Sequence, residues 1–317
     1  MKNLFCLLSL FFLSYSFSIA DSFDFEYQKI IDVENKAELE LINGSGNVKI
    51  EGAAIDQVII SAVKHVRATD LAEAEVVADH IEIKAFKNGD RIRVETRFLK
   101  MSRTNDSFWK KLFGSGSDSF GSIDFEISVP YYCKLDIDNT SGTVIINNID
   151  NNIRVTSATG EINISGVEGD IDIAGTSSIV FIASLEGDAD IRTTTGDIEV
   201  SGLFGNLKGK STSGDIKLYQ ESGSHIIGTN SGDIRVKTEL NTDRECHVET
   251  DTGRIYFLVP SSSSGKVKLE TISGSINTEL PLTVKQFAKN KLNGEFGHNG
   301  PKIILETQTG DITLGQF

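Results

Sequence analysis

The composition of the chain excludes several classes of protein. It has 317 residues, 39% of them hydrophobic, and 45 acidic against 31 basic side chains, for a formal net charge of −14. This charge excludes nucleic acid as a partner, because binding to phosphates needs clustered Lys and Arg, and it excludes attachment to anionic lipid by net charge alone. Many glycines (29) and few prolines (4) are typical of a fold with many turns and few rigid linkers.

The first 20 residues have the pattern of a secretory signal peptide. Lys2 precedes an apolar stretch over residues 4–13, and small residues lead to Ala20. This pattern predicts cleavage before Asp21. The alternative is an uncleaved membrane anchor, but a membrane-spanning helix needs about 20 apolar residues. We therefore expect a protein exported to the periplasm or the cell surface, without a transmembrane segment after cleavage.

Residues 21–122 are predicted to form an N-terminal β-rich region. Alternating apolar residues on both sides of Asn-Gly-Ser-Gly predict a β-hairpin over 37–52. A further strand is expected over 57–66. A second hairpin is expected over 81–98, around the turn at Asn88-Gly89-Asp90.

One short helix interrupts these strands, at about residues 69–80. Thr69 or Asp70 can serve as the N-cap, and the stretch that follows is rich in Ala and Glu. The residues expected on its buried face are Leu71, Ala74, Val77 and Ala78.

Residues 101–122 predict a long flexible loop, because Ser, Gly and Asp dominate the segment. Its apolar and basic residues are Phe108, Trp109, Lys110, Lys111, Leu112 and Phe113. Aromatic side chains in a polar loop indicate a candidate contact with a membrane or a protein partner. The alternative is a flap that folds back and buries its own aromatic rings.

From residue 123 to 317 the chain repeats a short motif. "TTGDIEV" (194–200), "TSGDIKL" (212–218) and "NSGDIRV" (230–236) are examples, and the spacing of the glycines reveals a unit of about nine residues. Such self-similarity predicts a repeat architecture. We expect a β-solenoid, β-helix-like or β-roll-like, in which about two units form one coil. An insertion at 280–301 interrupts the repeat near its end.

Each repeat unit alternates apolar and polar residues with a period of two. Ile198 and Val200 are expected to point inward, and Asp197 and Glu199 outward. The glycines are expected at corners, where positive φ is needed. The Thr or Ser before each glycine is expected to form a hydroxyl ladder or to tie down the corner. The repeat is therefore first a device for building a core.

The solenoid geometry also bears on the two cysteines that follow the signal peptide. Cys133 and Cys246 both fall at inward positions, five or six coils apart. At about 4.8 Å per coil their separation far exceeds the 7 Å that a disulfide allows. We predict two buried free thiols.

An Asp follows the glycine in many repeats, at positions 170, 188, 197, 215, 233 and 311. A calcium-binding β-roll is one hypothesis, but it requires clustered glycines, and here a single glycine precedes each Asp. Solvated turn residues are the alternative. The next outward position changes sign along the chain, from Asp172, Asp190 and Glu199 to Lys208, Lys217 and Arg235. This change of sign favours a structural role, and no cofactor or metal is predicted.

Motifs of catalysis are absent from the sequence. The five histidines have no metal-ligand spacing, and no nucleophile elbow, phosphate loop or dinucleotide fingerprint occurs. A secreted glycan-active β-helix enzyme with paired carboxylates is the alternative function, because β-helices include enzymes of that kind. The abundance of carboxylates gives no means of selecting a pair.

The order of these motifs resembles a known bacterial family. "INGSGNVKIEG", the Ala/Glu-rich helix, "GDRIRVETR", "FEISVPYYCKLDIDNTSGTV" and serial "TTGDIEVSG" are similar to the "putative adhesin" β-strand-repeat domain family of unknown function, over roughly residues 35–315. The resemblance implies a β-solenoid-like fold and an envelope role, and it implies no catalytic residues. We expect a non-enzymatic, adhesin-like binding or structural module whose partner is an envelope glycan or protein, with possible peripheral membrane contact through residues 101–122.

Overall fold

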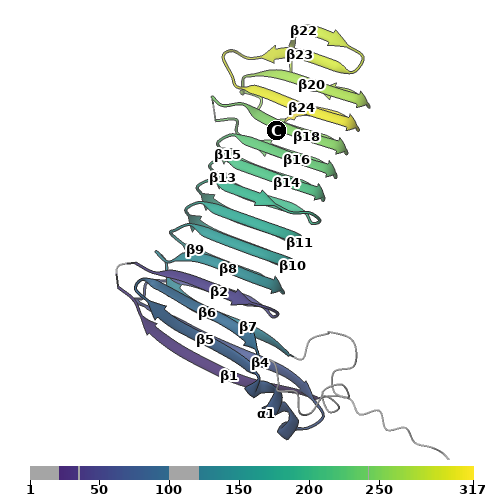
Figure 1. The fold of residues 1–317 in the computed structure, drawn as a ribbon. Helices are drawn as coiled ribbons and strands as arrows, with labels where there is room; N and C mark the ends of the chain where they lie inside the picture. The colour runs from purple at the N-terminus through teal and green to yellow at the C-terminus, as the bar shows by residue number, and fades with distance from the viewer. Residues whose placement is uncertain (1–20, 35, 100–120, 242) are drawn as a thin grey trace, which may run out of the picture.

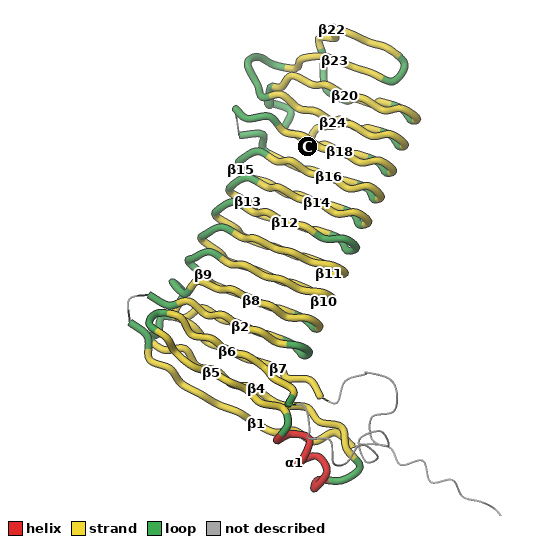
Figure 2. The backbone as a smooth tube through the Cα atoms, viewed as in Figure 1, coloured by secondary structure: helices red, strands yellow, loops and turns green. Residues whose placement is uncertain are grey.

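The computed structural model describes residues 21–317 except 35, 100–120 and 242. The predicted signal peptide and the candidate contact residues from Phe108 to Phe113 lie outside the described residues. The described chain is nearly all β with one helix, as predicted (Figures 1 and 2). It has 25 strands. None of its described helices is both long enough and apolar enough to span a bilayer.

The strands stack into two layers, which we call sheet I and sheet II. Sheet I comprises, in spatial order, β5 (Ile81–Asn88), β6 (Arg91–Phe98), β2 (Glu38–Asn43), β8 (Lys134–Ser141), the first halves of β10 (Ile153–Glu168) and β11 (Ile171–Glu186), β12 (Ala189–Arg192), β14 (Leu207–Ser213), β16 (His225–Ser231), β18 (Cys246–Thr252), β24 (Lys302–Thr309), β20 (Gly265–Ser273), β23 (Lys291–Phe296) and β22 (Thr283–Ala288).

Sheet II faces sheet I across the core. It comprises, again in spatial order, β1 (Asp21–Asp32), β4 (Gln57–Ala68), β7 (Gly121–Pro130), β3 (Val48–Ala53), β9 (Val144–Ile149), the second halves of β10 and β11, β13 (Ile198–Phe204), β15 (Ile216–Ser222), β17 (Ile234–Thr238), β19 (Ile255–Val259), β25 (Ile312–Gln316) and β21 (Ile276–Thr278).

One turn of the solenoid crosses both sheets and takes 18 residues in its regular part. Ile153 of one coil lies beside Ile171 of the next, and Ile162 lies beside Val180. The inward residues of sheet II form an unbroken column, each member fully buried: Ile162, Val180, Ile198, Ile216, Ile234, Ile255 and Ile312. Burial of each such side chain contributes about 1.5–3 kcal/mol, so repetition builds a core from short strands.

The predicted hairpin over 37–52 is wrong. β2 is hydrogen-bonded to β6 and β8, whereas β3 is hydrogen-bonded to β7 and β9, so the two strands belong to opposite sheets. Gly46, with a φ of 123°, turns a solenoid corner, as Gly142 does one coil later with the same φ. The turn signal is the same for a hairpin and for a corner. The second predicted hairpin is confirmed, because β5 and β6 are antiparallel from Ile81 to Phe98.

The predicted helix is confirmed as α1 (Leu71–Asp79). Asp70 is the N-cap, and its carboxylate accepts the backbone N–H of Glu73. Ala74, Val77 and Ala78 are buried as expected, but Leu71 is 55% exposed. Leu71 lies in the first turn, before the first buried residue of the helix. The predicted loop also ends earlier than expected, because β7 begins at Gly121.

Both ends of the solenoid depart from simple chain order. Near the N-terminus, the coil of β2 and β3 lies between that of β6 and β7 and that of β8 and β9. Near the C-terminus, the coil of β24 and β25 lies between that of β18 and β19 and that of β20 and β21. The insertion at 280–301 contains both strands of the antiparallel pair β22 and β23, which extends sheet I beyond β20 (Figure 1).

Candidate binding surface

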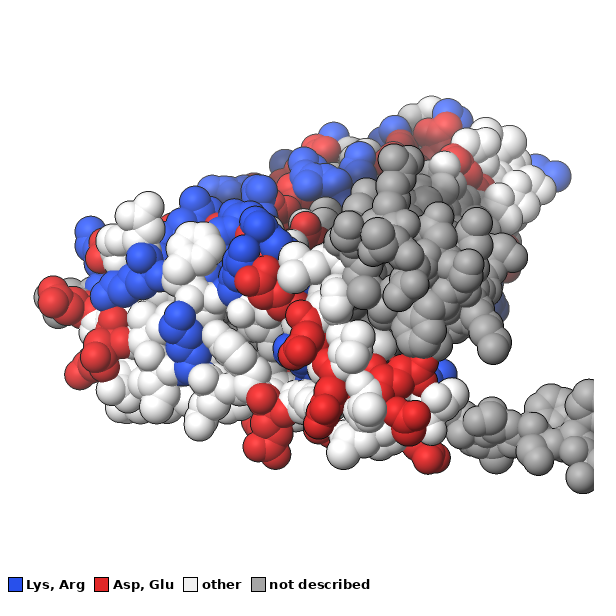
Figure 3. Space-filling model, turned by 60° about the horizontal axis from the view of Figure 1, so that its bottom comes forward, with Lys and Arg blue, Asp and Glu red and all other residues white. Residues whose placement is uncertain are grey.

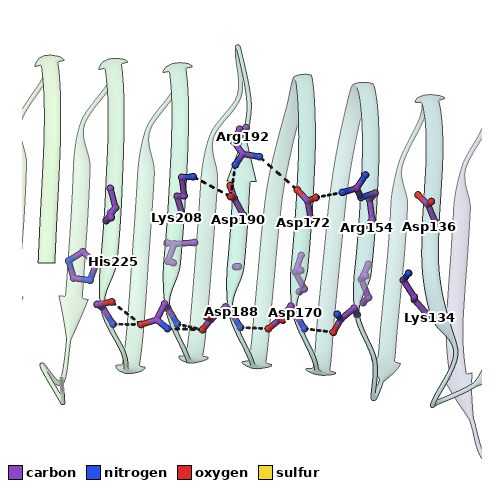
Figure 4. A pocket seen from close by; sticks show the side chains of 18 of the residues that line it. Lys134, Asp136, Arg154, Asp170, Asp172, Asp188, Asp190, Arg192, Lys208 and His225 are labelled. Atoms are coloured by element: carbon purple, nitrogen blue, oxygen red, sulfur yellow. Dashed lines mark hydrogen bonds and ion pairs between the residues drawn. The ribbon is translucent and has the colours of Figure 1, made fainter. Parts of the chain in front are cut away.

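The recurrent Asp residues form ladders along the corners. At the corner from sheet I to sheet II, Asp197 Oδ1 accepts the backbone N–H of Asp215 at 2.8 Å, and Asp233 Oδ1 accepts that of Arg254 at 2.8 Å. At the opposite corner, Asp170 Oδ1 accepts the N–H of Asp188 at 3.0 Å (Figure 4). Each carboxylate thus caps a backbone donor one coil away. This geometry favours the structural hypothesis over a calcium-binding corner.

A second ladder of hydrogen bonds lies inside the corner from sheet I to sheet II. Buried hydroxyls three residues before the glycines donate to glycine carbonyls: Thr229 to Gly214 at 3.1 Å and Thr250 to Gly232 at 3.1 Å. The residue just before the glycine, which the sequence singled out, is exposed, although Thr195 and Ser177 do form a hydroxyl pair at 2.9 Å. The buried hydroxyls satisfy carbonyls that no strand can reach.

The outer face of sheet I carries a row of charged side chains. Asp172 bonds Arg154 through Oδ2 at 2.8 Å and lies 3.9 Å from Arg192. Asp190 is paired with Arg192 and lies 3.6 Å from Lys208 (Figure 4). The opposite charges predicted for Asp190 and Lys208 therefore meet. Each exposed pair contributes about 1 kcal/mol or less, so the row serves charge balance more than stability.

An open groove of about 850 Å³ runs along this charged row. Residues from at least five successive coils line the groove. Six of them are basic and six are acidic: Arg91, Lys134, Arg154, Arg192, Lys208 and Arg244, and Glu38, Asp136, Asp170, Asp172, Asp188 and Asp190. The row from Arg154 to Lys208 and the corner row through Asp170 and Asp188 run side by side along the stack (Figure 4). Such a groove offers repeated donors and acceptors, one set per coil, to a ligand that is itself extended.

The charges are not spread evenly over the molecule. Seen toward its N-terminal end, Lys and Arg gather along one side, whereas Asp and Glu prevail elsewhere (Figure 3). Sheet I begins there with β5 and β6, and β6 carries Arg91, Arg93 and Arg97. Arg93 and Arg97 both pair with Glu95, whose side chain is 10% exposed. The basic side chains are therefore neutralised locally but remain at the surface.

One histidine interrupts the apolar column of sheet I. His225 is fully buried, its Nδ1 lies 2.9 Å from Gln220 Oε1, and its Nε2 has no hydrogen-bond partner. Burial lowers the pKa of the His225 imidazole to about 3. The ring packs 5.6 Å from the ring of Phe257. His225 is among the residues that line the groove, but its imidazole ring is buried in the core.

The two thiols are free and buried, as predicted. Burial raises the pKa of Cys133 to about 12 and that of Cys246 to about 11. A nucleophilic cysteine needs the opposite shift, because the thiolate is the reactive form. Both cysteines are core residues.

The pKa values of two surface carboxyl groups, Asp311 and Glu270, are lowered. A general acid in glycan cleavage needs a raised carboxyl pKa. Hydrogen bonds from Ser275 lower the pKa of Asp311, and a hydrogen bond from Lys291 lowers that of Glu270. No group of three His, Cys, Asp or Glu side chains in the described part of the chain is arranged to hold a metal ion.

Sequence reasoning found part of this surface. It singled out Asp172, Asp190 and Lys208, but not Arg154 or Arg192, which join them into a row. The alternation along each strand shows which side chains point outward. Which of these become neighbours depends on the register between coils, and that register follows from the exact length of a coil. The predicted contact residues from Phe108 to Phe113 lie outside the described residues and stay a prediction.

Comparison with solved structures finds distant likenesses. A "putative cell adhesion protein" from Clostridium sporogenes has 16% identity, with 92% of this chain and 100% of that chain covered and a TM-score of 0.26. A "putative adhesin" from Bacteroides fragilis has 11% identity, coverage of 92% and 97%, and a TM-score of 0.39. One from Parabacteroides distasonis has 12% identity, coverage of 92% and 97%, and a TM-score of 0.38. No curated protein shows significant similarity.

The sequence itself carries a family signature. The match to the Toastrack DUF4097 family runs over residues 29–315, which is almost the whole described chain. It covers the N-terminal strands, the helix and the repeat together, and it confirms the resemblance drawn from the motifs. The chain therefore belongs to the Toastrack DUF4097 family.

Proposed function

We propose that this protein is a non-enzymatic, exported module of the cell envelope that binds an extended polar ligand, a glycan or a protein segment, along the groove of sheet I. The observation that supports the proposal is the groove itself, in which successive coils each contribute charged side chains to one continuous surface. A ligand that is extended along the stack can repeat the same contacts from coil to coil.

The rigidity of the scaffold supports a binding role. The corner carboxylates and the buried hydroxyls hold each coil to the next, so the backbone positions from which the groove side chains extend are set before a ligand arrives. A preorganised surface loses less conformational entropy on binding than a mobile one. Export is supported by the signal peptide predicted from residues 1–20.

A non-enzymatic role is supported by how the carboxylates of the groove are used. Asp170 and Asp188 cap backbone donors, and Asp172 and Asp190 form ion pairs with Arg154, Arg192 and Lys208. Side chains held in this way supply binding contacts rather than a proton donor and a nucleophile. The glycan-active enzyme stays the alternative outcome of the experiment below.

The test is retention of residues 21–317 on fractionated bacterial envelope: outer membrane, peptidoglycan and soluble periplasm. The informative variant is Arg154→Glu with Arg192→Glu, which reverses two charges in the groove. The matched control is Lys217→Glu, an exposed ion-pair lysine on sheet II. We expect saturable retention on one fraction, reduced at least tenfold by the groove variant and unchanged by the control.

Two results would contradict the proposal. Retention that is equal for the groove variant and the wild type would remove the groove from the binding surface. Turnover of envelope glycans that is lost on substitution of one Asp or Glu would make the protein an enzyme. Deletion of residues 101–120 tests the contact predicted from the sequence at Phe108 to Phe113, because loss of retention in that variant alone would place the binding residues in this segment.

A further inference from the structure

The two sheets end unequally at the C-terminal end of the solenoid. Sheet II ends at β21, which pairs only with β25. Sheet I continues past β20 with two antiparallel strands, β23 and then β22 (Figure 1). The outermost hairpin of sheet I therefore has no strand of sheet II opposite its last strand, within the part of the chain that the structure describes.

The inner side of this hairpin leaves apolar side chains in water. Phe287 is paired with Leu292, and Val284 with Gly294, so both point to the side on which Leu292 enters the core. Leu292 is 5% exposed, whereas Phe287 is 72% exposed and Val284 is 50% exposed. All six residues of β22 are exposed. The side of β22 that carries Phe287 and Val284 continues the core side of sheet I, but nothing in the described chain covers it.

Hydrogen bonds hold the hairpin turn against the end of β20. Asn290 Nδ2 donates to the carbonyl of Ile272 at 2.7 Å, and the N–H of Thr271 donates to the carbonyl of Asn290 at 3.0 Å. These bonds fix the turn beside Ile272, which is 67% exposed. Val284 and Phe287, on the uncovered core side of β22, form what we call the apolar tip.

The sequence segment that contains the hairpin has a net charge opposite in sign to that of the whole chain. Residues 265–301 contain the basic side chains Lys266, Lys268, Lys285, Lys289 and Lys291 and the acidic side chains Glu270, Glu279 and Glu295, a net charge of +2 in a chain of −14. Lys285 pairs with Glu295, and Lys291 pairs with Glu270. Lys289 lies at the turn itself and takes part in none of the described ion pairs, so its ammonium group adds charge next to Phe287.

The opposite end of the solenoid is closed instead. Lys29 Nζ of β1 donates to the carbonyl of Ala85 on β5, and Lys87 Nζ donates to the carbonyl of Asp32 at 2.8 Å. Two lysines thus bridge the edges of the two sheets, a device that protects exposed strand edges. The N-terminal end also has exposed apolar side chains, with Ile30 54% and Phe86 48% exposed, and basic residues on β5 and β6, but there the lysines tie the edges of the two sheets together.

We propose that the apolar tip rests on an anionic lipid surface, with Phe287 and Val284 in the interfacial layer and Lys289 among the headgroups. Apolar side chains flanked by lysines are the chemistry that such an interface binds. Its place at the end of a rigid stack lets the tip reach a surface without obstruction. The identification of a membrane as the partner rests on the envelope location in the proposed function.

A second copy of the chain fits the tip less well. Pairing of two β22 edges would bring two hairpins of the same positive charge together, and like charges facing each other across strands are unfavourable. An anionic surface neutralises that charge instead. Dimerisation through β22 is therefore an outcome of the test and not the proposal.

The first experiment is co-sedimentation of residues 21–317 with phosphatidylcholine vesicles, with and without phosphatidylglycerol. We expect the bound fraction to rise with phosphatidylglycerol and to fall as salt screens the charges. Val284→Ser with Phe287→Ser should lower vesicle affinity at least fivefold, and Lys289→Glu should lower it for anionic vesicles. Phe204→Ser, which changes an exposed phenylalanine at a corner (54% exposed), is the control and should bind as the wild type does.

The second experiment reports the position of the tip directly. Both native thiols are buried, so Phe287→Cys can be labelled with an environment-sensitive dye under native conditions, and Phe204→Cys serves as the matched label. We expect a blue shift on addition of anionic vesicles at position 287 and none at position 204. Circular dichroism melts of every variant show whether the fold is kept.

The outcomes separate this inference from the proposed function. Equal vesicle binding by the wild type and the Val284→Ser, Phe287→Ser variant would overturn the inference, as would no binding or equal dye shifts at both positions. A dimer in solution that Phe287→Ser abolishes would also overturn it, because a second copy would then cover the tip. Retention on an envelope fraction without vesicle binding would leave the proposed function intact while the inference fails.

Discussion

Asp215 Oδ1 accepts the backbone N–H of Asp233 at 2.8 Å, from the same position one coil further along the solenoid. Asp215 itself donates its N–H to Asp197 in the preceding coil. Asp215 is therefore both a cap and a capped residue, and so are Asp188 and Asp233. The recurrence of Gly-Asp reflects the need of each coil to satisfy a corner donor of the next.

Substitution of a corner carboxylate should weaken the solenoid modestly. Asp215→Ala removes the acceptor of the Asp233 N–H, and we expect a loss of about 1 kcal/mol in the free energy of unfolding, since water can reach this exposed corner. Asp215→Asn keeps an acceptor oxygen and should lose less than half of that. Urea denaturation of the two variants measures the difference. Equal losses would show that charge, and not the ladder, is what the corner needs.

The buried hydroxyl ladder predicts a difference between two threonines of one strand. Thr250→Val leaves the carbonyl of Gly232 without its side-chain donor inside the corner, at a cost of about 1–3 kcal/mol. Thr252 precedes the glycine and is exposed, so Thr252→Val should change stability by about 0.5 kcal/mol or less. Thermal melts of both variants provide the comparison. A larger loss for Thr252→Val would contradict the assignment of the tie to the buried hydroxyl.

The corner glycines should tolerate no side chain. Gly232 has a φ of 154°, and a Cβ there would lie 2.2 Å from the carbonyl oxygen of Gly214. Gly232→Ala should therefore cost on the order of 3 kcal/mol. Gly209 lies at an inward position between Ile191 and Ile227, where a Cβ meets only the Leu207 side chain at 3.8 Å or more. Gly209→Ala should be neutral or stabilising, and a similar loss at both glycines would argue against the corner clash.

His225 predicts a dependence of stability on pH. Its pKa is about 3 when folded and near 6.5 when unfolded, so between these values the unfolded state binds a proton that the folded state does not. Stability from this group is complete above pH 6.5 and is lost as the pH falls toward 3. The expected loss from pH 7 to 5 is about 2 kcal/mol. His225→Leu should remove that part of the slope, and an unchanged slope in denaturation at the two pH values would contradict it.

The two thiols should be unreactive until the protein unfolds. Burial raises the pKa of Cys133 to about 12 and that of Cys246 to about 11, so almost no thiolate is present at pH 8. Residues 21–317 should release no chromophore from a disulfide reagent when native, and two equivalents in denaturant. Rapid release from the native protein would place one of the thiols at the surface.

The sequence was sufficient for the repeat and its inward faces. Ile198 and Val200 are buried because a period of two forces alternate side chains onto one face, whatever surrounds the strand. The separation of Cys133 and Cys246 followed from counting coils. The division of the chain at residue 122 stays a prediction, since β2 and β3 of the first part are hydrogen-bonded to β8 and β9 of the second.

Local patterns by themselves therefore determined which residues alternate, where the chain bends and which helix forms, because dihedral preference and burial act within a few residues. Only the tertiary structure decided what each bend connects. Asn-Gly-Ser-Gly at 43–46 has the composition of a hairpin turn, yet the strands beside it pair with residues far away in the sequence. The row from Arg154 to Lys208 and the uncovered Phe287 likewise depend on register and on which sheet ends first, and hydrogen bonds between distant strands set both.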